Sequence, residues 1–175
     1  MAGGGLEVTR ILALIIAAGS CYFRPKGKRN MQPAFKPEDY DVPAEYRHWP
    51  GDTAEDNIGP FFFYMDGPHP RTAFRPREEH SNTHRTIHGG ILMTFADYTA
   101  CLGASSGEQE SSATISLNTE FVAPAHVGDL LLGEGEVLRR GHSLVFVRVK
   151  VYVKHRVIMT ASAVIKRLRD RSEKK

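Results

Sequence analysis

Apolar and polar residues alternate along most of the last third of the chain. The alternation covers residues 113–121, 130–138, 144–153 and 157–165, and a period of two is typical of β-strands that bury one face. Short turns separate these segments, with a clear turn at residues 140–142. The pattern therefore predicts four long strands, and the short connections favour antiparallel pairing between successive strands.

A different period precedes these strands. Ile91, Phe95, Tyr98 and Leu102 recur at spacings of four, three and four residues, which is the spacing of one face of an α-helix. Further apolar residues widen this face until the helix is apolar nearly all round, as expected of a buried helix. We therefore predict a helix over residues 88–103 and an α+β fold in which the sheet wraps around it.

The first half of the chain predicts less regular structure. Residues 61–65 and 72–75 flank the turn Asp66-Gly67-Pro68, which predicts a pair of short strands. Residues 31–58 are rich in proline and acidic residues, and this composition favours an irregular lead-in with no more than a helical turn. The expected organisation is a tail over residues 1–30, a lead-in over residues 31–58, one domain over residues 59–168, and a charged tail over residues 169–175.

Residues 11–18 form an uninterrupted apolar run near the N-terminus. Eight residues are far fewer than the roughly 20 that a transmembrane helix needs. With Arg10 before it and Cys21 after it, the run has the form of a short signal peptide with a lipoprotein-like cysteine, so export or lipid anchoring is one interpretation. We favour the alternative, in which the natural protein begins at Met31 and residues 1–30 are dispensable.

Charge and cysteine content narrow the functional class. The net charge is +3, but the first 30 residues carry +4 and the remaining chain −1. A protein that binds nucleic acid is expected to carry positive charge on its folded body, so the balanced body argues against that class. The two cysteines, Cys21 and Cys101, do not suggest a disulfide framework. This cysteine usage favours a reducing compartment, and we expect a cytoplasmic protein.

Asp97 is the one acidic residue between positions 91 and 106, within the apolar helix. Removing a carboxylate from water is costly unless the group is hydrogen-bonded or used in chemistry. Two interpretations follow. Asp97 is either a structural acid, exposed or satisfied by hydrogen bonds, or it is a general base or nucleophile that faces a cavity.

His88-Gly89-Gly90 stands at the start of the same helix. The first-turn N–H groups of a helix have no intrahelical partners and carry partial positive charge. Because glycine lets a ligand approach the backbone closely, this segment is able to form an oxyanion hole for a carbonyl oxygen that becomes negative during attack. The alternative is a helix start with two glycines and no ligand.

The spacing of these elements resembles that of the PaaI-like branch of the hotdog acyl-CoA thioesterases. The elements are Asn82, His88-Gly89-Gly90, Asp97, the strand that begins at Thr114, and Ala123-Pro124-Ala125. The likeness covers about residues 59–168, and Asn82 and Asp97 make it far more specific than the His-Gly-Gly element alone. The resemblance implies a hotdog fold, a highly curved antiparallel sheet around one long buried helix, and hydrolysis of acyl-CoA to a free acid and CoA.

The resemblance also assigns the central chemistry. The Gly89 N–H would polarise the thioester carbonyl, with Gly90 beside it at the substrate. Asp97 would come from the other subunit and act as general base or nucleophile. The implied assembly is therefore a homodimer, or a dimer of dimers, with its active site at the subunit interface.

Further roles follow from the same resemblance. Asn82 and His88 would shape the site and hold the carbonyl or the water, and Thr114 would orient the attacking water. A turn matches a family segment near the nucleotide end of CoA, where its arginine would meet phosphate. This turn consists of Arg140, Gly141, His142 and Ser143.

His80, His84 and His88 are spaced as zinc ligands on a helix are, but the residues between them favour a loop, and the resemblance implies no metal or organic cofactor. Three further functions compete with hydrolysis. They are binding of acyl-CoA without turnover, a dehydratase or hydratase activity on the same fold, and a membrane-tethered module based on residues 11–21. The residues expected to line the acyl pocket are Phe61, Ile91, Leu92 and Phe95.

Overall fold

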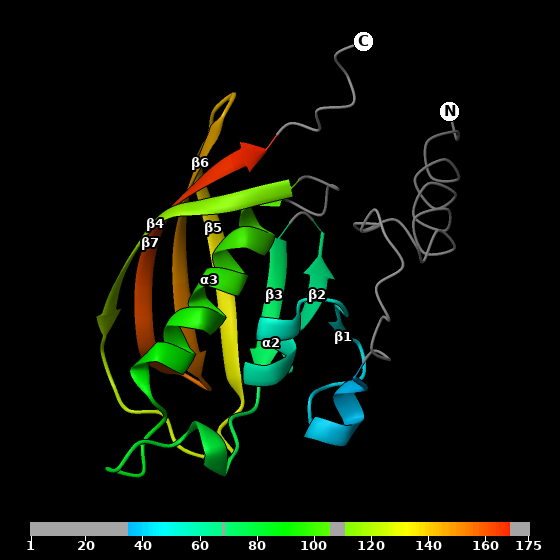
Figure 1. Ribbon diagram of the computed structural model, residues 1–175, viewed down its shortest axis with the longest axis vertical. Coiled ribbons are helices and arrows are strands. Elements are labelled where there is room, and N and C mark those ends of the chain that lie inside the picture. The colour runs from blue at the N-terminus through cyan, green and yellow to red at the C-terminus, as the bar shows by residue number, and fades with distance from the viewer. Residues whose placement is uncertain (1–34, 68, 106–110, 169–175) are drawn as a thin grey trace, which may run out of the picture.

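A curved antiparallel sheet wrapped around one long helix forms the body of the protein in the computed structural model (Figure 1). The structure describes residues 35–67, 69–105 and 111–168. The sheet has seven strands in the order β1-β2-β3-β5-β6-β7-β4, and every neighbouring pair is antiparallel. This architecture confirms the predicted α+β class and the predicted sheet around a buried helix.

The regular elements follow the predicted order closely from residue 61 onwards. The helices are η1 (Pro37–Tyr40), α2 (Thr53–Ile58), η2 (Glu78–His80) and α3 (Gly89–Ser105). The strands are β1 (Arg47–His48), β2 (Phe62–Asp66), β3 (His69–Phe74), β4 (Ser111–Phe121), β5 (Leu131–Arg140), β6 (Leu144–Val153) and β7 (Arg156–Leu168). The predicted long helix, two short strands and four long strands are thus confirmed.

The partner of β4 differs from the sequence-based prediction. Successive strands β5, β6 and β7 are neighbours as expected, but β4 pairs with β7 and not with β5. The connection after β4 does not make a tight turn, because it passes beneath the start of α3, where the Ala125 carbonyl accepts the Ile87 N–H at 2.8 Å. As a result, β4 forms one edge of the sheet, directly beside α3.

Close contact between α3 and β5 depends on glycines. The helix packs on β3, β4, β5, β6 and β7, and its buried residues include Phe95, Thr99 and Gly103. A methyl group on Gly135 would lie 3.0 Å from the Thr99 carbonyl oxygen. A methyl group on Gly133 would lie 2.7 Å from Thr99 Oγ1. The glycines therefore set how deeply the helix sits in the sheet.

The segment before residue 59 is more ordered than its composition predicts. It contains η1, α2 and the short strand β1, which extends the sheet beyond β2. Val42 packs against Phe62 and Ala73 in a second, smaller apolar cluster, and His48 pairs with Asp56 at 2.8 Å. The proline and acidic content therefore did not predict these short elements, because contacts with the sheet stabilise them.

Residues 1–34 and 169–175 lie outside the described residues, so the interpretations of the N-terminal apolar run and of Cys21 are not addressed by the structure. Within residues 35–67, 69–105 and 111–168, no helix is long and apolar enough to cross a membrane.

Gly133→Ala tests the close packing of α3 on β5. The added methyl group would overlap the hydroxyls of Thr72 and Thr99, which are 2.7 Å apart and hydrogen-bonded to each other. We expect the free energy of unfolding in urea to fall by about 1–3 kcal/mol, although alanine is otherwise favoured over glycine within a strand by roughly 0.5–1 kcal/mol. Glu136→Ala, at an exposed position of the same strand, is the control. Unchanged or increased stability of Gly133→Ala would show that the helix tolerates a wider separation.

Candidate active site

A hydrogen-bonded chain leads to Asp97 in the middle of α3. The Thr114 hydroxyl of β4 donates to the Asp97 carboxylate, with 2.6 Å between Oγ1 and Oδ1. Thr114 Oγ1 also lies 3.5 Å from Cys101 Sγ. Because a hydroxyl has a single proton and Asp97 receives it, the Cys101 thiol is the donor in this second contact. Burial raises the pKa of the Cys101 thiol, which keeps that donor protonated.

The start of α3 presents a backbone donor at Gly89. His88 precedes the helix, and its Nδ1 accepts the Gly90 N–H at 3.0 Å, as a capping side chain does. The His88 carbonyl accepts the N–H groups of Ile91 and Leu92. The Gly89 N–H has no acceptor among the residues that the structure describes. Of the two glycines, Gly89 therefore offers the donor for a ligand, since the Gly90 donor is occupied.

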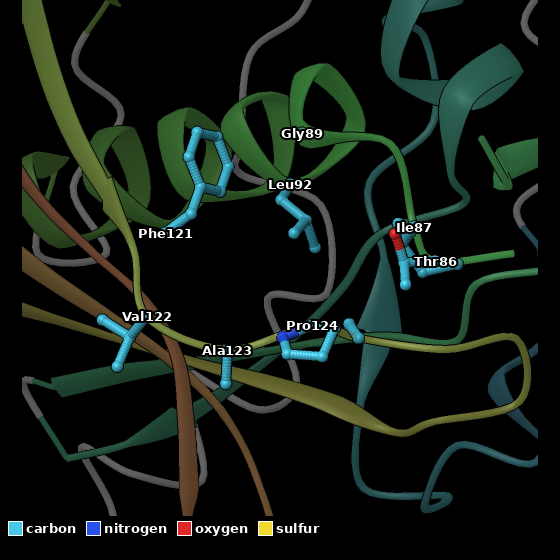
Figure 2. Close-up of a pocket in the computed structure, with 9 residues that line it drawn as sticks. Thr86, Ile87, Gly89, Leu92, Phe121, Val122, Ala123 and Pro124 are labelled. Atoms are coloured by element: carbon cyan, nitrogen blue, oxygen red, sulfur yellow. The ribbon is translucent and has the colours of Figure 1, made fainter. Parts of the chain in front are cut away.

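A cavity of about 370 Å³ opens beside Gly89. Figure 2 shows Gly89 and Leu92 of α3 on one side of it and the segment after β4 on the other. Its lining is mostly apolar and consists of Thr86, Ile87, Gly89, Leu92, Phe121, Val122, Ala123, Pro124 and Ala125. The cavity has room for part of an acyl group next to the free N–H.

The predicted lining of this pocket was mostly wrong. Of the four residues expected there, Leu92 lines the cavity. Phe61 and Phe95 are instead core residues, with ring centroids 5.4 Å apart, and Ile91 is half-buried against the same core. Phe121, which the alternating pattern places at the end of a strand, forms part of the wall, and a methyl group on Gly89 would lie 3.0 Å from its ring.

Asn82 shapes the loop before α3 through local hydrogen bonds. Its Oδ1 accepts the N–H groups of His84 and Thr86 at 2.8 and 3.2 Å, and its Nδ2 donates to Thr86 Oγ1 at 2.9 Å. These bonds hold the loop that delivers His88 to the helix start. All of these contacts are internal to the loop, so Asn82 has a structural role that is independent of any ligand.

The turn Arg140 to Ser143 lies far from the Gly89 cavity within the chain. Leu144, which follows the turn, pairs with Lys166, and Lys166 in turn pairs with Ala113 near the start of β4. The cavity lies at the opposite end of β4, beyond Phe121. The structure therefore does not bring this turn and Gly89 together in one chain.

Gly89 and Asp97 are also separated. Eight residues of α-helix, at about 1.5 Å per residue, place them about 12 Å apart along the axis of α3. Asp97 does not line the cavity that Gly89 lines. A single thioester carbonyl therefore cannot contact both groups of one chain across that distance.

The three histidines at positions 80, 84 and 88 do not converge on a metal. His80 is buried, with its Nδ1 accepting the Arg77 N–H, whereas His88 caps the helix and is exposed. In the described part of the chain, no group of three or more histidine, cysteine or acidic residues is arranged to hold a metal ion.

Glu55 is a half-buried acid that the sequence pattern did not reveal. It lies on α2, close enough to Asp97 for the two charges to interact, and burial together with the carboxylates of Asp52, Asp97 and Asp56 raises its pKa to about 8. Asp52 lies three residues before Glu55, and this spacing is typical of the start of a helix. The spacing could therefore have predicted α2. Nothing in the local pattern indicates that Glu55 is half-buried.

A family model described as the thioesterase superfamily matches residues 84–160, which include α3 and most of the long strands. A protein of Pseudomonas aeruginosa that carries the name of an esterase is 31% identical over 112 residues, which cover 62% of this chain and 84% of that protein. The chain belongs to the thioesterase superfamily.

Further similar proteins include a named thioesterase and two solved structures. Human acyl-coenzyme A thioesterase 13 is 29% identical over 73 residues, which cover 41% of this chain and 52% of the human protein. The PaaI protein of Escherichia coli, from the phenylacetic acid degradation operon, has a TM-score of 0.62 at 17% identity and covers 68% of this chain and 86% of that protein. The Streptococcus mutans protein smu.793, solved with acetyl CoA, has a TM-score of 0.58 at 19% identity and covers 63% of this chain and 90% of that protein. These structures establish the hotdog fold.

The Thr114 hydroxyl is expected to matter for turnover more than for binding, because it contacts Asp97 directly. A hydrogen bond to a charged group contributes about 1.5–3 kcal/mol, so we expect Thr114→Val to lower kcat for thioester hydrolysis roughly 10- to 100-fold with little change in KM. Thr114→Ser keeps the hydroxyl and should be nearly silent. A Thr114→Val enzyme with wild-type kcat would show that this bond is structural.

Proposed function

We propose that this protein hydrolyses acyl-CoA thioesters to a free acid and CoA, with Asp97 as the catalytic carboxylate and the Gly89 N–H as the oxyanion donor. The observation that carries the proposal is the 2.6 Å hydrogen bond from Thr114 to Asp97. It holds one carboxylate oxygen in place and leaves the other to act on water. Membership of the thioesterase superfamily supports thioester hydrolysis as the general reaction.

In the proposed reaction, Asp97 acts as a general base. It removes a proton from water while the water oxygen attacks the thioester carbonyl carbon, and the carbonyl oxygen becomes an oxyanion that accepts the Gly89 N–H. Collapse of this tetrahedral intermediate breaks the carbon–sulfur bond and releases the acid. The proton held by Asp97 passes to the departing CoA thiolate, which restores the carboxylate. A direct attack by Asp97 on the carbonyl is the alternative route.

The active site requires two chains in this proposal. The separation of about 12 Å between Gly89 and Asp97 along α3 prevents the two groups of one chain from acting on one carbonyl. The edge strand β4 and the residue after it expose the apolar side chains of Ile115, Phe121 and Val122, each more than half accessible. A second copy that covers this edge would bury these side chains and bring its own α3 close to Asp97. We therefore propose a homodimer, or a dimer of such dimers.

The CoA ester is the favoured substrate class because two of the similar proteins point to it. One carries the name of an acyl-coenzyme A thioesterase, and another was solved with acetyl CoA. Within this chain, the exposed turn from Arg140 to Ser143 supplies a cation for the CoA phosphates in our proposal. Because that turn lies far from Gly89 of its own chain, its contact with CoA also depends on the assembly.

A dehydratase or hydratase is less compatible with the site. Those reactions need a histidine that exchanges a proton with substrate together with an acid. His88, the residue directly before Gly89, uses Nδ1 to cap α3. The acyl-CoA thioesterase therefore remains the function that the geometry supports best.

Asp97→Asn tests the proposed chemistry. The amide preserves the shape and can still accept the Thr114 hydrogen bond, but it cannot take a proton from water. We expect kcat to fall by at least about a hundredfold while the fold and the oligomeric state are retained. The assay is release of free thiol from a panel of short, long and aromatic acyl-CoAs. The control is Asp66→Asn, which changes an exposed acid at the end of β2. Turnover by Asp97→Asn within a few-fold of wild type would contradict the mechanism, and a folded wild-type protein that releases thiol from none of the panel would contradict the function.

A further inference from the structure

The ring of Phe121 lies directly over Gly89 at one wall of the cavity. Phe121 is the last residue of β4, and a methyl group on Gly89 would lie 3.0 and 3.2 Å from the ring atoms Cζ and Cε1. Carbon atoms in van der Waals contact are about 3.5–4.0 Å apart, so the space between Gly89 and the ring does not admit one further carbon. Figure 2 shows the ring turned towards α3, and Leu92 of that helix lines the same cavity. The cavity is therefore narrow where the Gly89 N–H meets it.

Several polar backbone groups in the rest of the cavity wall are already hydrogen-bonded. The N–H groups of Val122 and Ala123 both donate to the Ile158 carbonyl, at 2.8 and 3.1 Å. The Pro124 carbonyl accepts Nη1 of Arg156 at 2.5 Å. In the described part of the chain, the residues that line the cavity include no ionisable side chain. The wall therefore offers few partners to a polar or charged ligand.

This lining fits the acyl group better than the pantetheine arm of CoA. Pantetheine carries amide groups, and an amide that leaves water without a new hydrogen bond loses free energy. A hydrocarbon chain gains free energy when the same wall covers it. A carboxylate at the end of an acyl chain would meet no cation in this lining. The ligand that the cavity suits is therefore an apolar acyl group.

The Gly89 N–H places the start of that acyl group beside Phe121. A carbonyl oxygen that accepts this N–H lies about 2.9 Å from the nitrogen. The first carbon of the acyl chain is joined to the carbonyl carbon, so it lies in the part of the cavity that the Phe121 ring bounds. An unbranched chain passes beside the ring, whereas a methyl branch on this first carbon needs the space that the ring occupies.

We propose that Phe121 is a specificity-determining residue whose ring restricts the acyl group to apolar chains that are unbranched at the carbon next to the thioester carbonyl. The inference rests on the proposed function and names the acyl groups that its site accepts. One methyl group that does not fit a packed apolar site is expected to change specificity about tenfold or more. A smaller side chain at position 121 removes the restriction.

Binding of two CoA ketones tests the restriction without hydrolysis. In both ketones a methylene group separates the sulfur from the carbonyl, so water cannot release the thiol. One carries a pentyl group, and the other carries a pentyl group with a methyl branch next to the carbonyl, used as each enantiomer. We expect calorimetry to show that the wild type binds the unbranched ketone at least about tenfold more tightly. In Phe121→Ala this ratio should fall below about threefold, and in Phe121→Leu it should be intermediate.

Ile115→Ala is the matched control, because Ile115 is an exposed apolar residue of the same strand that does not line the cavity. The proposed homodimer covers both Ile115 and Phe121, so the oligomeric state of each variant is measured by native mass spectrometry. Ile115→Ala should keep the wild-type ratio between the two ketones. Binding of CoA without an acyl group should be the same in the wild type and in Phe121→Ala. An equal loss of affinity for CoA and for both ketones would place the ring against pantetheine and overturn the inference.

The same preference is expected in turnover, where the ratio of kcat/KM values measures specificity. The kcat/KM of the wild type for hexanoyl-CoA should be at least about tenfold that for 2-methylhexanoyl-CoA, and Phe121→Ala should reduce this ratio below about threefold. A wild-type ratio near one, or a ratio that Phe121→Ala leaves unchanged, overturns the role of Phe121 and leaves the acyl-CoA thioesterase function intact.

The binding and turnover experiments separate the two proposals. A wild-type protein that discriminates between the ketones but hydrolyses neither ester contradicts the proposed function, while Phe121 keeps its role in binding. A folded wild-type protein that binds neither ketone overturns the inference.

Discussion

Close burial of α3 in the concave face of the sheet constrains every other part of the structure. Gly133 and Gly135 let the helix approach β5, and the hydrogen bond between Thr72 and Thr99 closes the contact with β3. With the helix fixed at this depth, Asp97 on its middle turn lies within hydrogen-bond distance of Thr114 on the edge strand β4. The position of the carboxylate is thus a consequence of helix–sheet packing.

The same rigid helix separates the two candidate catalytic groups. The N–H of Gly89 lies beside the apolar cavity, and the carboxylate of Asp97 lies about two turns away. Local bonds support each half independently, through His88 at the helix start and through Cys101 and Thr114 at its middle. The proposed site therefore needs two paired chains, and the proposed pairing would cover the exposed apolar side chains along β4.

Features set by local pattern were predictable from the sequence. Alternation identified the long strands, and helical spacing identified α3 with Asp97 and the glycines in place. Features set by tertiary contacts were not. The pairing of β4 with β7 depends on a connection that passes beneath α3, and the cavity wall at Phe121 depends on that pairing. The partial burial of Glu55 depends on how α2 packs, and the composition of the surrounding segment had predicted an irregular chain.

The central claim is that each active site uses Gly89 of one chain and Asp97 of another, and complementation between two inactive variants measures it most directly. Gly89→Pro removes the backbone donor in the first turn of α3, and its ring also crowds Phe121 of the same cavity, so this variant disables the Gly89 half of the proposed site. Asp97→Asn removes the base. In a mixed dimer of these variants, one site carries both lesions and the other carries neither. We predict that mixing the two inactive proteins restores acyl-CoA hydrolysis, up to half the wild-type activity per mixed dimer. No recovery, with mixed dimers confirmed by native mass spectrometry, would contradict the shared site.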